Sequence, residues 1–229
     1  SLYGIEKDLT LKFLKREKLE SIKGLYVIID AEYLRGRKPA DVARAVIQGG
    51  ASVIQFRDKI HDIRRRLNDA EKISQICREH HTPFIINDSL EVALAVNADG
   101  LHVGQDDLPV YIARRLLPKD KLVGCSVRTV AEAKRACEHG ADHLGVGAIY
   151  QTSTKQADVV GPPRIIEISQ AVPLPIVAIG GITSQNIAAV LKAGAVAACV
   201  ISSVMSSDDI TGATAQLVAA MKEIDGKSG

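Results

Sequence analysis

Short apolar runs alternate with longer stretches of helical periodicity along most of the chain. The runs are rich in Val, Ile and Ala, which is typical of parallel strands that are buried on both faces. Strands are expected at residues 25–30, 52–57, 84–87, 100–103, 122–126, 143–147, 176–181 and 198–202. Helices are expected at residues 40–48, 63–80, 89–96, 110–117, 130–139, 184–193 and 212–224. This alternation favours parallel pairing with right-handed crossovers.

Glycines and capping residues mark several of the expected boundaries. The dipeptide Gly-Ala recurs at residues 50–51, 140–141 and 194–195, each time just before a strand, where glycine ends a helix in the left-handed conformation. Thr129 precedes a helical run with Glu132 three places on, which predicts a capping box. We therefore expect an α/β fold of repeated units, a (β/α)8 TIM barrel, with an open doubly wound sheet as the structural alternative.

The length of 229 residues suits a single barrel domain. Residues 24–229 are expected to form the barrel catalytic domain, and residues 1–23, rich in Lys, Glu and Leu, an N-terminal helical extension. Hydrophobic residues make up 46% of the chain, enough for a large core, but only 3% are aromatic. The core must therefore be built from Val, Ile, Leu and Ala.

Charge and cysteine content exclude some classes of function. The net charge of +2 argues against a nucleic-acid partner, and no apolar run is long enough to span a membrane. The four cysteines are scattered without a C-x-x-C pair, as expected for reduced thiols in a cytoplasmic protein. Small-molecule substrates are expected, and the sequence leaves open whether the chain forms a homo-oligomer.

The second strand carries the first group of candidate functional residues. Side chains alternate along a strand, so Gln55, Arg57 and Lys59 share one face. Ile54 and Phe56 share the other face, which must pack against helices. Two cations and an amide over the barrel mouth would form a pyrophosphate clamp. The alternative is an ordinary solvated strand end.

Carboxylates follow the next two strands. The third strand ends in Asn87-Asp88, and Gln105-Asp106-Asp107 follows the fourth. Carboxylates beside a cationic pyrophosphate site predict a metal ion between them, and Mg²⁺ prefers carboxylates together with phosphate oxygens. Taken alone, Asp88 could equally be a helix cap.

The last three strands are followed by residues suited to a phosphate. Thr152 to Lys155 supply hydroxyls and one cation, Gly180-Gly181 follows the seventh strand, and Ser202-Ser203 follows the eighth. In TIM barrels the turns after the seventh and eighth strands commonly bind phosphate through backbone N–H groups.

In this order, these motifs resemble the thiamine-phosphate synthase (thiamine-phosphate pyrophosphorylase) family. The resemblance covers roughly residues 24 to 205. It is carried by Q-x-R-x-K at residues 55–59, IIND at 85–88, GLHVGQDD at 100–107, T-x-T-K at 152–155 and VAIGGI at 177–182. It implies a transferase that joins 4-amino-5-hydroxymethyl-2-methylpyrimidine pyrophosphate to a thiazole phosphate, giving thiamine phosphate and pyrophosphate.

The resemblance also implies a role for each matching residue. The residues that would hold the pyrimidine pyrophosphate are Gln55, Arg57, Lys59, Asn87, Ser126 and Lys155, of which Arg57, Lys59, Ser126 and Lys155 would act in catalysis. Asp88 and Asp107 would bind Mg²⁺, the implied cofactor. The thiazole phosphate would contact Thr152, Thr154, Gly181, Ile201 and Ser202.

The chain departs from the family pattern at Arg128, where many relatives carry His, and at Gln151, where they carry Pro. Arg128 would be either an additional cation for a substrate or a solvated side chain ahead of the capped helix. Two alternative functions stay open: a thiazole tautomerase on the same barrel, which would need an acid–base residue at position 128, and a non-catalytic phosphate-binding regulatory module. Arg is a poor proton shuttle because it stays protonated.

Overall fold

The computed structural model describes residues 2–152 and 158–225. Within these residues, eight parallel strands pair in chain order, and the first pairs with the last, so that the sheet closes into a barrel. The strands are β1 (Gly24–Asp30), β2 (Val53–Arg57), β3 (Phe84–Asn87), β4 (Gly100–Val103), β5 (Leu122–Val127), β6 (His143–Val146), β7 (Ile176–Ile179) and β8 (Ala197–Val200). The expected TIM barrel is confirmed, and the open-sheet alternative is excluded.

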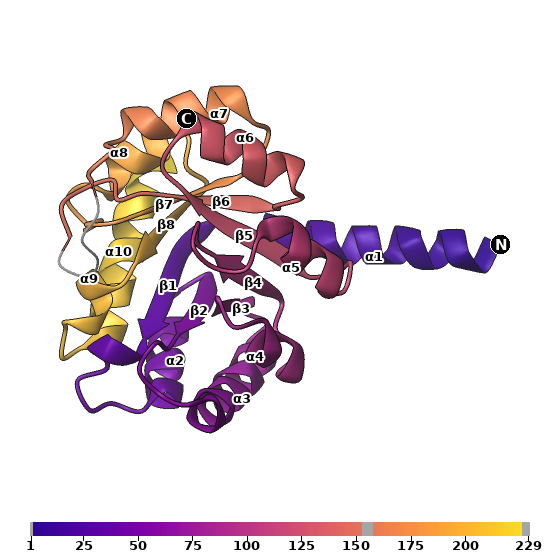
Figure 1. Cartoon of the computed structure of the whole chain (residues 1–229). Helices are drawn as coiled ribbons and strands as arrows, with labels where there is room; N and C mark the ends of the chain where they lie inside the picture. Colours follow the sequence, from indigo (N-terminus) through magenta and orange to yellow (C-terminus); the bar gives the residue numbers. More distant parts are fainter. Residues whose placement is uncertain (1, 153–157, 226–229) are drawn as a thin grey trace.

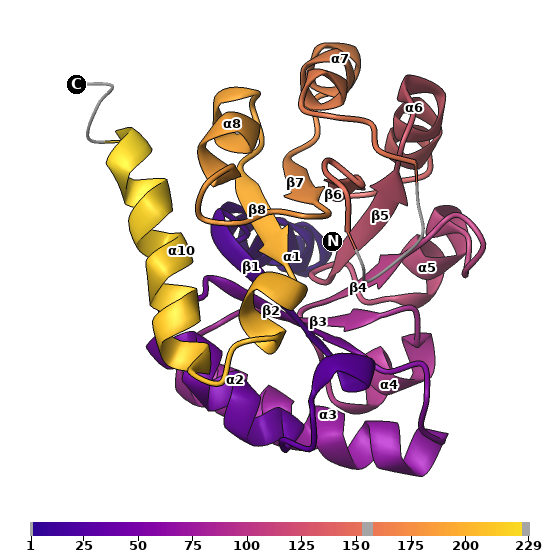
Figure 2. The ribbon, with the colours of Figure 1, turned by 90° about the vertical axis from the view of Figure 1, so that its left-hand side faces the viewer.

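The helices lie outside the barrel, and most of them surround it (Figures 1 and 2). They are α1 (Leu2–Glu20), the 3-10 helix η1 (Ala31–Tyr33), α2 (Pro39–Gln48), α3 (Ile63–Glu79), α4 (Leu90–Ala95), α5 (Val110–Leu116), α6 (Val130–Glu138), α7 (Pro163–Ala171), α8 (Ile187–Lys192), α9 (Ser202–Met205) and α10 (Ile210–Asp225). Most boundaries agree with the expected ones to within two residues.

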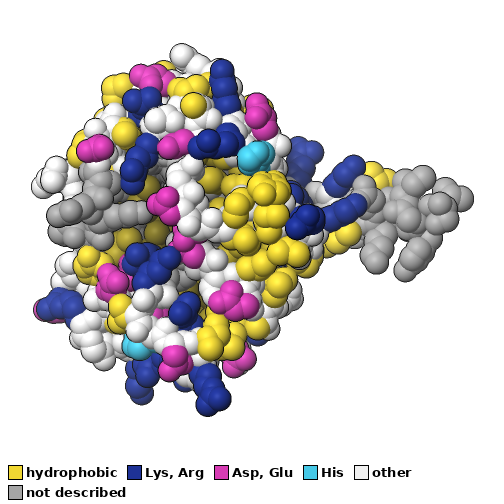
Figure 3. Space-filling model, in the orientation of Figure 1, with side chains coloured by type: hydrophobic (Ala, Val, Ile, Leu, Met, Phe, Trp, Pro, Cys, Tyr) yellow, Lys and Arg dark blue, Asp and Glu magenta, His cyan; other side chains and the backbone are white. Residues whose placement is uncertain are grey.

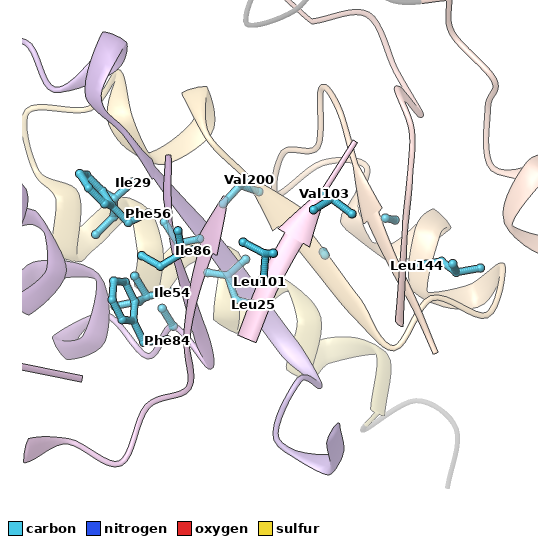
Figure 4. Packing of buried hydrophobic residues seen from close by; sticks show 14 of the residues in the cluster. Leu25, Ile29, Ile54, Phe56, Phe84, Ile86, Leu101, Val103, Leu144 and Val200 are labelled. Atoms are coloured by element: carbon cyan, nitrogen blue, oxygen red, sulfur yellow. The ribbon is translucent and has the colours of Figure 1, made fainter. Parts of the chain in front are cut away.

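Alternating strand positions divide the apolar side chains into two clusters. Outward-facing residues such as Ile54, Phe56 and Leu101 pack against the helices in the larger cluster (Figure 4). Inward-facing residues such as Tyr26 and Ile85 form a smaller cluster inside the barrel. Because every strand is covered on both faces, the strands read as continuous apolar runs. Burying each large aliphatic side chain stabilises the fold by roughly 1.5–3 kcal/mol.

Helix α1 leaves the barrel at the amino-terminal ends of the strands and projects away from it (Figure 1). Its base is held by Lys15, which pairs with Asp142 at 2.6 Å, and by Lys18, which pairs with Asp120 at 3.0 Å. Ile22, in the turn after α1, is buried against the inner cluster. Ile22 thus packs against the barrel interior from the amino-terminal side, and TIM-barrel active sites lie at the opposite end. The division into an extension at residues 1–23 and a catalytic domain at 24–229 stays a prediction.

The expected helix-to-strand turns are present. Gly50, Gly140 and Gly194 have φ angles of 93°, 90° and 105°, the left-handed region that favours glycine. The predicted capping box at the start of α6 is confirmed, because the Thr129 hydroxyl accepts from the Glu132 N–H while the Glu132 carboxylate accepts from the Thr129 N–H.

Helices η1, α7 and α9 were not among the expected elements. Helix α7 begins at Pro163, directly after Gly161-Pro162; proline is tolerated in the first turn of a helix because that N–H has no intrahelical partner. The helix expected at residues 184–193 begins only at Ile187. Thr183 donates its N–H to the Asn186 side chain at 2.9 Å, which stabilises a turn instead of the first helical residues.

The surface beside the base of α1 differs from the rest of the visible face. Hydrophobic side chains gather over α5, where Tyr111 and Leu116 are exposed, while charges of both signs are interspersed elsewhere (Figure 3). In the part of the chain that the structure describes, no helix is both long and apolar enough to cross a membrane.

Candidate active site

Arg57 lies at the carboxyl end of β2, beside the end of β1. Its Nη1 donates to Asp30 Oδ2 at 2.6 Å, and the two residues are register partners across the strands. Asp30 is buried, and its second oxygen accepts the Glu32 N–H at 3.1 Å. Burial raises the pKa of the Asp30 carboxyl, and the Arg57 guanidinium opposes that rise. Asp30 therefore fixes the direction of Arg57 at the mouth of the barrel.

Lys59 is placed by the turn that follows β2. The buried Asp58 carboxylate accepts the N–H groups of Ile60 and His61, each at 3.0 Å, which holds the backbone on both sides of Lys59. The Lys59 ammonium forms an ion pair with Asp88 and lies 3.6 Å from an Asp107 oxygen. Burial alone would lower the pKa of Lys59, but the hydrogen bond and charge of Asp88 outweigh it and raise that pKa.

The Asp88 and Asp107 carboxylates converge on this ammonium. Asp88 has a φ of 60°, an uncommon value for a non-glycine residue, and its N–H donates to the His102 carbonyl at 2.8 Å. Ser89 occupies the N-cap position of α4, so Asp88 is not the cap. Asp107 is held by the Gly104 N–H, at 2.9 Å from Oδ2.

The pKa values of the two carboxyls shift in opposite directions. Burial and the neighbouring Asp107 raise the pKa of Asp88 despite the opposing effect of Lys59. For Asp107, burial is outweighed by hydrogen bonds from Asp88 and Gly104 and by Lys59, so its pKa is lowered. The cluster therefore favours a cation between the two carboxylates, as Lys59 is here. Without a cation, Asp88 and Asp107 would share a proton.

Three polar side chains of neighbouring strands lie next to this cluster or below it. Asn87 donates through Nδ2 to Asp88 Oδ2 at 2.5 Å. Gln55 is buried inside the barrel and donates through Nε2 to the Tyr26 hydroxyl at 2.8 Å. Ser126 lies near the end of β5, with its Oγ 2.9 Å from His102 Nε2. Gln55 thus lies deeper than the expected clamp at the rim.

A pocket on the other side of the mouth is built from backbone and small side chains. Its lining residues are Thr152, Ile179, Gly180, Gly181, Ile182, Cys199, Val200, Ile201, Ser202 and Ser203. Gly180 and Gly181 have φ angles of 103° and 64°, and a Cβ on Gly180 would lie 2.7 Å from the Ala148 Cα. Glycine is therefore required here both by conformation and by space.

Comparison with known proteins identifies the family. A family model described as thiamine monophosphate synthase matches residues 25–204. The chain belongs to the thiamine monophosphate synthase family. As a member it is a transferase of thiamine biosynthesis that acts on small molecules.

Individual members of the thiamine monophosphate synthase family align over most of the chain. A thiamine-phosphate synthase from Chloroflexus aurantiacus is 47% identical over 195 residues, 84% of this chain and 90% of the relative. One from Shouchella clausii is 44% identical over 202 residues, 87% of this chain and 96% of the relative. A solved structure, thiamine phosphate pyrophosphorylase from Pyrococcus furiosus, has a TM-score of 0.82 at 35% identity and covers 90% of this chain and 98% of its own.

The structure brings most of the expected residues of a thiamine monophosphate synthase to one mouth. The residues on the charged side are Arg57, Lys59, Asn87, Asp88, Asp107 and Ser126. Those in the pocket are Thr152, Gly181, Ile201 and Ser202. Thr154 and Lys155 lie outside the described residues, so their expected contacts with substrate stay predictions. Arg128 is exposed, just beyond the end of β5, and its role is likewise untested.

Sequence reasoning missed two residues that support this site. Asp30 ends β1, and a carboxylate at the end of a strand next to the Arg57 strand was the available signal. His102 sits at an inward-facing position of β4, and the next two strands, β5 and β6, carry Gly124 and Gly145 beside its ring. An inward His flanked by glycines on the next strands was a signal for a ring that fills the barrel interior.

Proposed function

We propose that the chain condenses 4-amino-5-hydroxymethyl-2-methylpyrimidine pyrophosphate with a thiazole phosphate to give thiamine phosphate and pyrophosphate. The observation that carries this proposal is the meeting of two anion sites at one mouth. One side presents Arg57 and Lys59 with two carboxylates, and the other presents a glycine-lined pocket. The names of the similar proteins from Chloroflexus aurantiacus and Pyrococcus furiosus support the same reaction.

Arg57 and Lys59 would stabilise the leaving pyrophosphate. Arg57 is already held in place by Asp30, and Lys59 lies beside Asp88 and Asp107, so both cations are close to where negative charge would develop. The aminopyrimidine ring can delocalise the positive charge left on its methylene carbon, and the thiazole nitrogen then forms the new carbon–nitrogen bond. No protein nucleophile is needed for this route.

The site residues fit Mg²⁺ with few protein ligands. Asp88 and Asp107 converge on the Lys59 ammonium, which shows that their oxygens attract a cation. In the described part of the chain, no group of three His, Cys, Asp or Glu residues could hold a metal. Asp88 and Asp107 would therefore hold Mg²⁺ together with substrate oxygens and water. When bound, Mg²⁺ would neutralise part of the charge on the leaving pyrophosphate.

The glycine-lined pocket would hold the phosphate of the thiazole. Its walls, apart from the Thr152 and serine side chains, are apolar or backbone, and a phosphate there would be bound by N–H and hydroxyl groups. Ser203 already donates to the Ile182 carbonyl, so Ser202 is the pocket serine that would donate its hydroxyl to a ligand. A thiazole anchored by its phosphate on this side would direct its ring towards the pyrimidine.

The charged cluster favours the synthase over the two alternatives. A thiazole tautomerase does not need a pyrophosphate clamp, and the position of the expected acid–base residue is occupied by the exposed Arg128. A phosphate-binding regulatory module needs neither the Lys59 cluster nor the Asp30–Arg57 pair.

The deciding experiment is incubation of the protein with both precursors and Mg²⁺, followed by detection of thiamine phosphate. We expect product that depends on the metal, and none from an Asp88→Asn, Asp107→Asn double variant. Absence of thiamine phosphate with folded protein, or isomerisation of the thiazole without any condensation, would refute the proposal.

A further inference from the structure

Two histidines point into the barrel interior directly below the proposed pyrophosphate site. His102 on β4 and His143 on β6 have ring centroids 5.6 Å apart. His102 Nε2 lies 2.9 Å from Ser126 Oγ. The other ring nitrogens, His102 Nδ1 and both nitrogens of His143, are buried, and no hydrogen-bond partner for them is found among the described residues.

The space for these rings exists because the intervening strand positions are glycines. A Cβ on Gly124 would overlap ring atoms of both histidines, and a Cβ on Gly145 would lie 3.0 Å from the His102 ring. Backbone without side chains on β5 and β6 thus sets the orientation of the His102 ring. That orientation brings Nε2, rather than Nδ1, to the Ser126 hydroxyl.

No carboxylate bonds to the His102 ring, since its Nε2 lies against Ser126 Oγ and its Nδ1 has no partner among the described residues. A neutral imidazole carries one N–H, on either Nε2 or Nδ1. A proton on Nδ1 would be a buried donor without an acceptor, which is rare in folded proteins. A proton on Nε2 is used in the bond to Ser126 and leaves only an unpaired acceptor at Nδ1.

We propose that His102 is a positioning residue for Ser126: it donates through Nε2–H to Ser126 Oγ and so turns the serine proton towards the barrel mouth. A serine hydroxyl has one donor and two acceptor sites. Once Oγ accepts from below, its own O–H is free to donate to an anionic oxygen above. In the opposite tautomer the serine proton would be used by the ring, and its lone pairs would face the anion. This role rests on the proposed function, in which Ser126 contacts the pyrophosphate.

A double-mutant cycle tests whether His102 acts through Ser126. His102→Leu removes the donor, Ser126→Ala removes the hydroxyl, and the double variant removes both. We expect each single variant to lower kcat by about tenfold, the effect of losing one hydrogen bond, and the double variant to lose no more than Ser126→Ala alone. His102→Gln, whose amide can still donate, should retain most of the activity. His143→Gln, which alters a buried imidazole without a bond to Ser126, is the matched control and should match the parent in kcat.

The tautomer can be measured without any substrate. In ¹⁵N nuclear magnetic resonance spectra, assigned by the loss of one signal set in His102→Gln, we expect the His102 ring to carry its proton on Nε2. A proton on Nδ1, or multiplicative losses in the double variant, would overturn the inference. An inactive parent with the Nε2–H tautomer would instead refute the proposed function and leave the hydrogen-bond direction standing.

Discussion

At the ends of β2, β3 and β4 the mouth carries charged side chains, whereas at the ends of β7 and β8 it is lined by glycine backbone and small residues. The cations of the charged half are paired with carboxylates before any ligand arrives. The glycine half leaves space for a ligand and presents backbone N–H dipoles to it. Charged groups respond strongly to charge that develops during a reaction, while a preformed backbone cradle binds a phosphate that does not change. The charged half should therefore govern turnover, and the glycine half substrate affinity.

The largest effect is expected from Lys59→Ala. Loss of one preorganised cation should remove about 2–4 kcal/mol of transition-state stabilisation, which lowers kcat by about 30- to 1,000-fold. Steady-state kinetics with both substrates would measure it, and Lys72→Ala, an exposed lysine on α3, is the control. A raised KM with unchanged kcat would mean that the charged half only binds substrate.

The next largest effect should distinguish Asp107 from the adjacent Asp106. Asp107 faces Lys59 and Asp88, whereas its neighbour Asp106 is exposed. We expect Asp107→Asn to lower activity by about 10- to 100-fold and to raise the Mg²⁺ concentration needed for half-maximal rate. Asp106→Asn should leave both unchanged. The reverse pattern would mean that Asp106, and not Asp107, binds the metal.

On the glycine side we expect an effect on affinity. Gly181→Ala places a Cβ in a left-handed conformation and against the Gln151 carbonyl and Tyr150. The KM for the thiazole phosphate should rise about tenfold, equivalent to about 1.4 kcal/mol, with little change in kcat. Gly36→Ala has a similar φ of 80° but meets no atom within 4 Å, so it controls for backbone strain alone. If both variants had equal effects on stability and neither changed KM selectively, the pocket would not be part of the thiazole phosphate site.

The comparison continues below the mouth, where β4 and β6 carry inward-facing histidines but β8 carries Ala197 and Cys199. Burial lowers the pKa of His143 from 6.5 to about 3, with His102 as a second cause. Below pH 6.5 the His143 imidazole takes up a proton in the unfolded chain but not in the folded chain, so the free energy of unfolding falls as pH falls. Between pH 6.5 and 5.5, His143 alone should contribute a loss of about 1 kcal/mol. Urea unfolding at pH 6.5 and 5.5 should show a smaller loss for His143→Gln than for the parent; identical losses would mean that His143 does not carry the acid sensitivity.

The sequence predicted the barrel because its strands are apolar on both faces and its turn glycines recur before strands, as at Gly50, Gly140 and Gly194. It also predicted most of the described residues that lie at the mouth, since residues at strand ends share one edge, although Gln55 lies deeper. It did not predict their partners. The Lys59–Asp88 and Arg57–Asp30 contacts depend on side-chain directions and backbone angles, such as the positive φ of Asp88, that no local pattern specifies. The inward-facing His102 required knowing that Gly124 and Gly145 lie beside it.

Titration of the protein with pyrophosphate by calorimetry, with and without Mg²⁺, tests the charged half most directly. Because the Asp88 and Asp107 carboxylates flank Lys59 and repel an anion, pyrophosphate should bind at least about tenfold more tightly with Mg²⁺ than without it. Mg²⁺ alone should bind weakly, and the Asp88→Asn, Asp107→Asn double variant should lose the dependence on metal. Equal pyrophosphate affinity of the parent with and without Mg²⁺ would contradict a metal-assisted pyrophosphate site at these residues.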